Sequence, residues 1–252
     1  MAGHSKWANV KYRKARVDAV KGKIFTKLSK EILMAARHGG SDMTNNISLR
    51  LAVQKARENN MPGDNIQRAI QKGTGELEGV IYEEIIYEGY GPGGFAIMLE
   101  ILTDNRNRTA GEIRHIFAKN GGNLGETGCV SWMFKRRGYL IVNETDYDED
   151  SLTLLALDAG AEDFVADDGT YEIFTLPEDF EKVKETLEGK GVTFSTAEVT
   201  MAPENLLEIN EAEEARMSLG LIETLEDHDD VQNVYSNLDI SQELMRVITD
   251  TL

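Results

Sequence analysis

The spacing of apolar residues changes near residue 80, and this change constrains the fold of the 252-residue chain more than any other feature. Before it, apolar side chains recur about every three to four residues, the period of a helix with one buried face. Three helices are predicted there, with apolar positions at Phe25 to Ala36, Leu49 to Ala56 and Ile66 to Ile70. After it, apolar and polar residues alternate, as in half-buried strands. The sequence therefore predicts an α+β protein that begins with a helical domain.

The second part of the chain predicts two α+β domains, one inserted in the other. Residues 79–135 contain two strands, a helix and a strand, which leaves their sheet one covering helix short. Residues 136–205 give a complete βαββαβ pattern, the ferredoxin-like order. Residues 206–240 then supply a helix and a strand. We therefore expect two ferredoxin-like domains, the middle one built from residues 79–135 plus 206–240. The remaining segments are a basic flexible arm (1–20), the helical domain (21–78) and a C-terminal tail (241–252).

Two finer features belong to the middle domain. Thr109-x-x-Glu112 has the spacing of a capping box and predicts the start of a helix, which residues 120–122 (Asn-Gly-Gly) end. Residues 129–134 predict a strand that precedes a separate strand over 139–142. Cys129 is the only cysteine and is predicted to be a core thiol, which fits a reducing compartment.

Charge is divided unevenly along the chain. Residues 1–75 carry 15 Lys and Arg against 5 Asp and Glu, residues 76–252 carry 12 against 39, and the net charge is −17. An acidic protein with cations at one end is suited to bringing that end to a polyanion, and nucleic acid is the polyanion that such arms bind. Lysines and arginines would contact phosphates, while Trp7 would stack on bases or anchor the arm. The predicted binding residues of this region are Lys6, Trp7, Lys11, Arg13, Lys14, Arg16, Lys21, Lys23, Lys27 and Lys30.

Arg106 and Arg108 form a second candidate nucleic-acid-binding site. They precede the predicted helix start, where the helix dipole disfavours cations unless an anion is bound. Free backbone N–H groups and the two guanidinium groups would then hold that anion. A surface loop with solvated arginines is the alternative, and the sequence leaves both open. Lys135-Arg136-Arg137 is a third and less specific patch, because an exposed strand end is often basic.

We expect no catalytic site, no cofactor and no metal. Gly89-x-Gly91-x-x-Gly94 has the spacing of a dinucleotide-binding loop, but such a loop must open a helix. Pro92 lies inside it and an apolar strand follows, so the segment predicts a Gly-rich hairpin. The four histidines lack the spacing of metal ligands. Neither a secretory signal nor an apolar run of ~20 residues is present, which predicts a cytoplasmic protein without membrane contact.

Several segments resemble the YebC/PmpR family, and the resemblance covers nearly the whole chain. They are MAGHSKW (1–7), KGKIFTKLSKEI (21–32), NMPGDNIQRAIQKGTGELEG (60–79), YEGYGPGG (87–94), TDNRNRT (103–109) and GGNLGETGCVSWMF (121–134). The resemblance implies a helical domain followed by two α+β domains. Members are described as DNA-binding transcriptional regulators and as translation factors, among them the mitochondrial translational activator of cytochrome c oxidase and bacterial proteins that relieve ribosome stalling on proline runs. No member is an established enzyme.

We therefore expect a non-enzymatic regulator of gene expression that binds nucleic acid through its arm and helical domain. RNA in the ribosome is favoured over a DNA operator, because the short third helix offers few side chains that could read base edges. These are Gln67, Arg68, Gln71 and Lys72. A DNA-binding transcriptional regulator is the first alternative. The second is a protein-interaction module whose acidic domains bind a basic partner.

Overall fold

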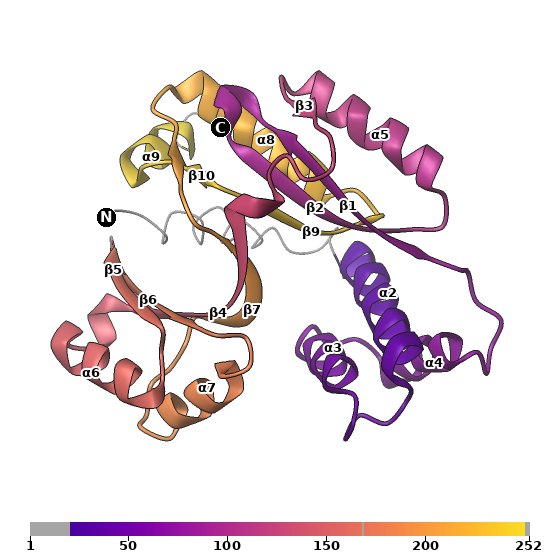
Figure 1. Ribbon diagram of the computed structural model, residues 1–252, viewed down its shortest axis with the longest axis horizontal. Helices are drawn as coiled ribbons and strands as arrows, with labels where there is room; N and C mark the ends of the chain where they lie inside the picture. The colour runs from indigo at the N-terminus through magenta and orange to yellow at the C-terminus, as the bar shows by residue number, and fades with distance from the viewer. Residues whose placement is uncertain (1–20, 168, 250–252) are drawn as a thin grey trace.

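The computed structural model describes residues 21–167 and 169–249 (Figure 1). Its N-terminal part contains the three predicted helices, which are confirmed. They are α2 (Lys21–Gly39), α3 (Ile47–Glu58) and α4 (Gly63–Thr74). Their apolar faces form one core, in which Ile32, Leu49 and Ala56 are fully buried.

Asn46 connects the end of α2 to the start of α3. Its side-chain oxygen accepts a hydrogen bond from the N–H of Leu49 at 3.0 Å, which caps α3. Its side-chain nitrogen donates to the carbonyls of Ala35 and Gly40, both at 2.8 Å. One buried amide thus satisfies backbone groups of both helices and fixes the angle at which the chain turns between them.

The first sheet is antiparallel, with strand order β3-β1-β2-β9, and two helices cover one of its faces (Figure 1). Its elements are β1 (Glu83–Tyr90), β2 (Ala96–Thr103), α5 (Arg106–Lys119), β3 (Asn123–Leu124), α8 (Ala212–Glu226) and β9 (Val231–Ser236). Ile97, Leu99 and Ile101 of β2 pack with residues of α5 and α8. Ala96 and Met98 belong to a different core on the opposite face. Both faces of β2 are therefore buried, which explains its almost continuous apolar sequence.

The second sheet is also antiparallel, with strand order β5-β6-β4-β7, and it has the ferredoxin-like arrangement predicted for the insert. Its elements are β4 (Phe134–Asn143), α6 (Glu149–Ala159), β5 (Asp163–Asp167), β6 (Thr170–Thr175), α7 (Phe180–Glu188) and β7 (Thr196–Pro203). Leu140 and Ile173 of the sheet pack with Leu152 of α6 and Val183 of α7. In the chain this sheet lies between β3 and α8, so one α+β domain is inserted in the other, as expected.

Shorter elements complete the described part. They are the 3₁₀ turns η2 (Pro92–Gly94), η3 (Ser131–Met133) and η4 (Glu144–Asp146), the strands β8 (Leu207–Glu208) and β10 (Leu238–Asp239), and the helix α9 (Gln242–Thr249). β8 and β10 pair in parallel. Ile248 of α9 is buried in the core of the first sheet. The segment predicted as a tail therefore contributes a helix to this core.

The apolar core on the opposite face of β2 joins the two sheets. Met98 and Tyr235 come from the first sheet, Tyr139 and Phe174 come from the second, and Phe134 lies where the chain passes between them. The rings of Tyr139 and Phe174 are tilted, with centroids 5.1 Å apart. Because these side chains are buried, the two sheets are packed against each other rather than joined by a loose linker.

Two local expectations are corrected. The strand predicted over residues 129–134 is not formed: η3 lies there, and β4 runs without a break because its pairing with β7 already begins at Phe134. α5 begins at Arg106 rather than Thr109, because the side chain of Asn105 accepts from the N–H of Arg108 at 3.1 Å and caps the helix. Thr109 is instead fully buried in the helix's first turns.

The middle domain has the two layers of a ferredoxin-like domain, but its helices and strands follow one another in a different order along the chain. It has two helices on one face of a four-stranded antiparallel sheet, as a ferredoxin-like domain has, but its elements follow as ββαβαβ. The α+β class is confirmed, while the residue bounds of the domains stay predictions. No helix within 21–167 and 169–249 is both long enough and apolar enough to span a bilayer.

Candidate nucleic-acid interface

The predicted nucleic-acid-binding residues fall into two groups. Those of the arm lie outside the described residues: Lys6, Trp7, Lys11, Arg13, Lys14 and Arg16. Lys21 is the first residue of α2. The structure gives the surroundings of the remaining candidates, which are Lys23, Lys27, Lys30, Arg106 and Arg108.

The lysines of α2 bind the end of α8. Lys23 Nζ lies 3.5 Å from a carboxylate oxygen of Asp227 and donates to the carbonyl of the same residue at 3.2 Å. Lys27 Nζ donates to the carbonyl of Glu226 at 2.5 Å. The last carbonyls of a helix carry partial negative charge, so ammonium groups are stabilised there. These lysines therefore dock α2 onto the C-terminal end of α8.

Lys30 is buried, with only 8% of its side chain exposed. Its Nζ lies 2.9 Å from Asp230 Oδ1, and it also donates to the carbonyls of Asp229 at 2.9 Å and Leu102 at 3.2 Å. The ammonium group lies 5.3 Å from the ring centroid of Tyr82. An ammonium has three N–H donors, and all three have partners here. Lys30 thus joins α2 to the first sheet, in place of the phosphate contact that the sequence predicted.

Asp230 is the centre of this network. Its Oδ2 accepts from Arg108 at 2.7 Å, from the Thr109 hydroxyl at 2.8 Å and from the Thr103 hydroxyl at 3.1 Å. Burial raises the pKa of the Asp230 carboxyl, but the hydrogen bonds from Lys30, Arg108 and Thr109 outweigh burial and hold that pKa well below its usual range. Asp230 is therefore ionised in the folded protein and balances the two cations beside it.

The two arginines at the start of α5 have different surroundings. Arg108 is 2.9 Å from Asp104 and 2.7 Å from Asp230, so carboxylates hold its guanidinium group. Arg106 is exposed, and within the described part of the chain no carboxylate pairs with it. Both belong to the first turn of α5, which Asn105 caps. Of the pair that the sequence proposed as an anion site, Arg106 is the one whose charge is available.

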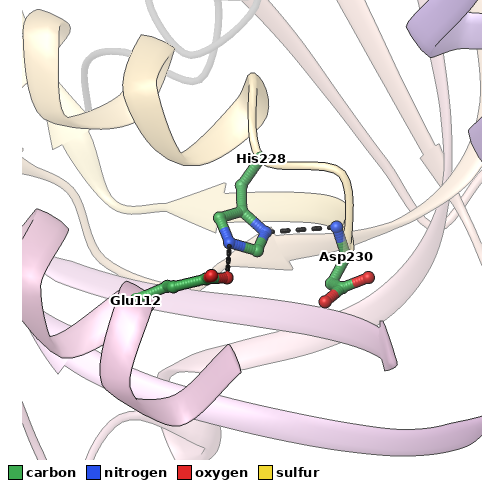
Figure 2. A group of neighbouring side chains, drawn as sticks. All are labelled: Glu112, His228 and Asp230. Carbon is green, nitrogen blue, oxygen red and sulfur yellow. Dashed lines mark hydrogen bonds and ion pairs between the residues drawn. The ribbon is translucent and has the colours of Figure 1, made fainter. Parts of the chain in front are cut away.

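Figure 2 shows Glu112, His228 and Asp230 beside one another. His228 Nδ1 accepts from the backbone N–H of Asp230 at 3.1 Å, so the ring proton lies on Nε2, which is 2.9 Å from Glu112 Oε2. One ligand atom from each residue lies within 4.8 Å of the others. A divalent cation there would meet Lys30 and Arg108, which already bind the Asp230 carboxylate. The cluster is therefore a poor metal site and a good structural network.

Several other cations of the helical part are exposed. They are Arg37, Arg50, Lys55, Arg57, Arg68 and Lys72, of which Lys55 pairs with Glu31. Arg68 and Lys72 are four residues apart and so lie on one face of α4. α3 and α4 are joined by only four residues, 59–62, a connection of the length found in helix–turn–helix proteins. This short connection favours the DNA-binding alternative.

The three residues of the third basic patch, 135–137, have different surroundings. Lys135 forms an ion pair with Glu204. The guanidinium group of Arg137 lies 5.8 Å from the ring centroid of Phe174, at cation–π distance. Arg136 lines a cavity of about 420 Å³ between the helical part and the two sheets. Three cations and four glutamates line this cavity, so its charge is too mixed for a polyanion groove.

Trp132 is a surface residue for which the sequence predicted no role. It is 68% exposed, and its indole N–H donates to the carbonyl of Cys129 at 3.1 Å. The buried carboxylate of Glu88 holds the segment that carries it, by accepting three backbone N–H groups within residues 128–131 at 2.7 Å each. Burial raises the pKa of Glu88, but these hydrogen bonds lower it below its usual range. An indole held exposed in this way is suited to stacking on a partner.

The Gly-rich segment forms the predicted hairpin. Gly93 and Gly94 have positive φ angles of 74° and 84°, a conformation that glycine adopts without strain. β2 follows directly, where a dinucleotide site would require the start of a helix.

Comparison with known proteins completes the description of the chain. The TACO1/YebC N-terminal domain matches residues 5–76, and the TACO1/YebC second and third domain matches residues 82–238. A "probable transcriptional regulatory protein" of Halothermothrix orenii is 61% identical over 252 residues, covering 99% of this chain and 100% of the relative. One of the same name from Natranaerobius thermophilus is 61% identical over 248 residues, covering 97% and 99%.

A solved structure is similar as well. It is a conserved hypothetical protein of Aquifex aeolicus, 47% identical, with a TM-score of 0.81 over 94% of this chain and 97% of that one. Its TM-score shows that the two chains share the fold described above. The chain belongs to the TACO1/YebC family, which its sequence motifs already indicated.

Proposed function

We propose that this protein regulates gene expression by binding nucleic acid through its N-terminal arm and helical part, and that its target is RNA in the ribosome. The family and the names of the relatives support the broader statement, a regulator of gene expression. The observation that carries nucleic-acid binding is the division of charge: residues 1–75 hold 15 of the 27 Lys and Arg but only 5 of the 44 Asp and Glu. In this proposal the protein acts by binding and not by catalysis.

Physical arguments favour RNA as the target. α4 presents only a few side chains, such as Gln67, Arg68 and Lys72, that could read base edges. Contacts to phosphates position a protein but discriminate little between sequences. A polyanion would repel the acidic remainder of the chain, so only one face can dock, as in a cleft of the ribosome. Relief of stalling at proline runs would be the corresponding activity.

The DNA-binding alternative has support of its own. α3 and α4 have the short connection of helix–turn–helix proteins. Relatives from Halothermothrix orenii and Natranaerobius thermophilus are named as transcriptional regulators. A DNA operator that the protein binds with a nanomolar Kd, about a thousandfold more tightly than random duplex DNA, would establish this alternative.

The first experiment tests whether the arm supplies the affinity. Removal of residues 1–20 deletes five cations: Lys6, Lys11, Arg13, Lys14 and Arg16. If about four of them contact phosphates of a labelled single-stranded RNA of mixed sequence, the slope of log Kd against log salt falls by about three. Fluorescence anisotropy across a salt series measures this slope. An unchanged slope would place the binding surface elsewhere.

The second experiment separates the two targets. We expect the full chain to sediment with ribosomes at about 150 mM salt, where nonspecific binding to duplex DNA is weak. Titration of genomic and random duplexes at the same salt is the comparison. If the protein is absent from the ribosome pellet at this salt and binds one duplex sequence selectively, the target is a promoter and not the ribosome.

A further inference from the structure

We propose that the outer face of α5 is a second contact surface for the nucleic-acid backbone. The inference rests on the proposed function, because it assumes that the protein binds a nucleic acid. The outer face of α5 is defined by its solvent-exposed residues after the first turn and by one residue within it. These are Asn107, Gly111, Arg114, His115, Ala118 and Lys119; Arg106, Arg108 and Glu112 are exposed as well but are not counted in this face.

The charge of α5 is opposite to that of its surroundings. Residues 76–252 carry 12 Lys and Arg and 39 Asp and Glu. Four of these cations but only one of the acids, Glu112, lie within the 14 residues of α5. A helix that follows the average of this region would carry mainly acids. The composition therefore marks α5 as a cationic element in an acidic molecule, which is the pattern expected of a phosphate-binding face.

The charged residues of the outer face are Arg114 and Lys119. Glu112 contacts His228 Nε2 at 2.9 Å and lies 4.0 Å from Arg108, and these contacts hold its carboxylate on the side of α5 that borders loop 226–230. Arg108 is itself bound by Asp104 and Asp230. Within residues 21–167 and 169–249, neither Arg114 nor Lys119 takes part in an ion pair. Their charges are available to an external anion.

The shape of the outer face also allows a nucleic-acid backbone to come close to α5. Gly111 lies in the middle of the helix, where glycine is destabilising by about 1 kcal/mol relative to alanine. A Cβ at this position would have no neighbour within 4 Å, and its φ angle is an ordinary negative one, so neither packing nor backbone geometry requires glycine here. Ala118 is the next small residue on the face. Arg114 and Lys119 thus lie on either side of the small residues Gly111 and Ala118, where a phosphate backbone can come close to the helix.

The position of α5 allows one nucleic acid to contact both the arm and this face. The arm precedes α2, and Lys23 in the first turn of α2 binds Asp227. Arg108 in the first turn of α5 binds Asp230, three residues further along the same loop. The start of α2 and the start of α5 therefore meet at loop 226–230. In Figure 1 α5 lies at the edge of the molecule far from the second sheet, whose segment 138–202 carries 17 acids and 3 cations.

Charge reversal on the outer face tests the inference. The variant Arg114→Glu with Lys119→Glu is compared with a control of equal net charge, Lys182→Glu with Lys190→Glu, which alters exposed residues of the acidic insert. The probe is a fluorescein-labelled single-stranded RNA of mixed sequence, and anisotropy gives its Kd across a salt series. If two phosphate contacts are lost, the Kd rises about ten-fold at about 100 mM salt and the log–log salt slope falls by about 1.4. The neutral variant Arg114→Ala with Lys119→Ala should give a smaller loss in the same direction.

The outcomes distinguish this inference from the proposed function. Because all four positions are exposed, thermal unfolding is expected to show the same midpoint for both variants within about 2 °C. A Kd that rises equally in the α5 variant and in the control would overturn the inference, since the effect would then be general repulsion. If removal of residues 1–20 weakens binding while the α5 variant does not, the inference fails and the proposed function remains. If neither change affects binding, both fail.

Discussion

Asp229 and Asp230 are neighbours in sequence with opposite surroundings, one exposed and one buried among donors. In Asp230→Asn, Lys30 and Arg108 lose the charge that balances them, and breaking a buried ion pair costs about 3–5 kcal/mol. We expect the free energy of unfolding to fall by about 3 kcal/mol at neutral pH. Because the pKa of Asp230 is lower in the folded chain than in the unfolded chain, this stabilisation is present above an unfolded pKa of about 4 and is lost as the pH falls further.

The control for this prediction is Asp229→Asn. It removes the same charge from the same loop but keeps the backbone carbonyl that accepts from Lys30. We expect a change within about 0.5 kcal/mol, as for an ordinary surface substitution. Urea unfolding at about pH 7 and about pH 3 measures both effects, and the gap between wild type and Asp230→Asn should shrink in acid. If both variants lose the same free energy of unfolding, the loss comes from the change in net charge and not from the broken buried ion pair.

At the scale of single elements, the contact between α2 and α4 depends on Gly73. A Cβ at this position would lie against the Leu33 carbonyl and 2.8 Å from Ala36 Cβ, so the two helices would have to move apart. We expect Gly73→Ala to destabilise the protein by about 1–3 kcal/mol, the usual cost of overpacking, although alanine is the better helix former. Gly63→Ala is the matched control, because a Cβ there has open space. Denaturant unfolding measures the difference between the two variants. If Gly73→Ala is more stable than the wild type, α2 and α4 can move apart without cost.

Element boundaries show what the sequence could and could not predict. The helices of the N-terminal part follow from apolar periodicity, since each buries one face. The predicted start of α5 at Thr109 is wrong because the hydroxyl of Thr109 is buried beside the distant Asp230, and Asn105 caps the helix instead. The roles of Lys23, Lys27 and Lys30 were hidden for the same reason: their partners in loop 226–230 are about 200 positions away in the chain. Sequence patterns report local periods, whereas these contacts are set by tertiary packing.

At the scale of the whole molecule, the helical part is attached by few contacts. The lysines of α2 bind loop 226–230, and a small apolar cluster joins Leu33 and Met34 to Leu102. Replacing all three lysines by glutamine should loosen this attachment while α3 and α4 keep their own core. We expect small-angle scattering to report a radius of gyration at least ~1 Å above the ~18 Å typical of a compact chain of this length. Glutamine at Lys182, Lys184 and Lys190 is the control, and an equal expansion there would attribute the change to charge alone.

The chain enters and leaves the second sheet at one place. Phe134 and Pro203, its first and last residues, are paired in register, and the Glu204 N–H donates to the Met133 carbonyl at 2.9 Å. In evolutionary terms, one insertion or deletion in the gene is therefore enough to gain or lose all of residues 134–203, since the ends of the remaining chain already meet. The residues that the insert covers are less easily changed. A descendant without it would have to replace the side chains of β2 that face the insert, Ala96 and Met98, by polar ones to keep its first sheet from aggregating.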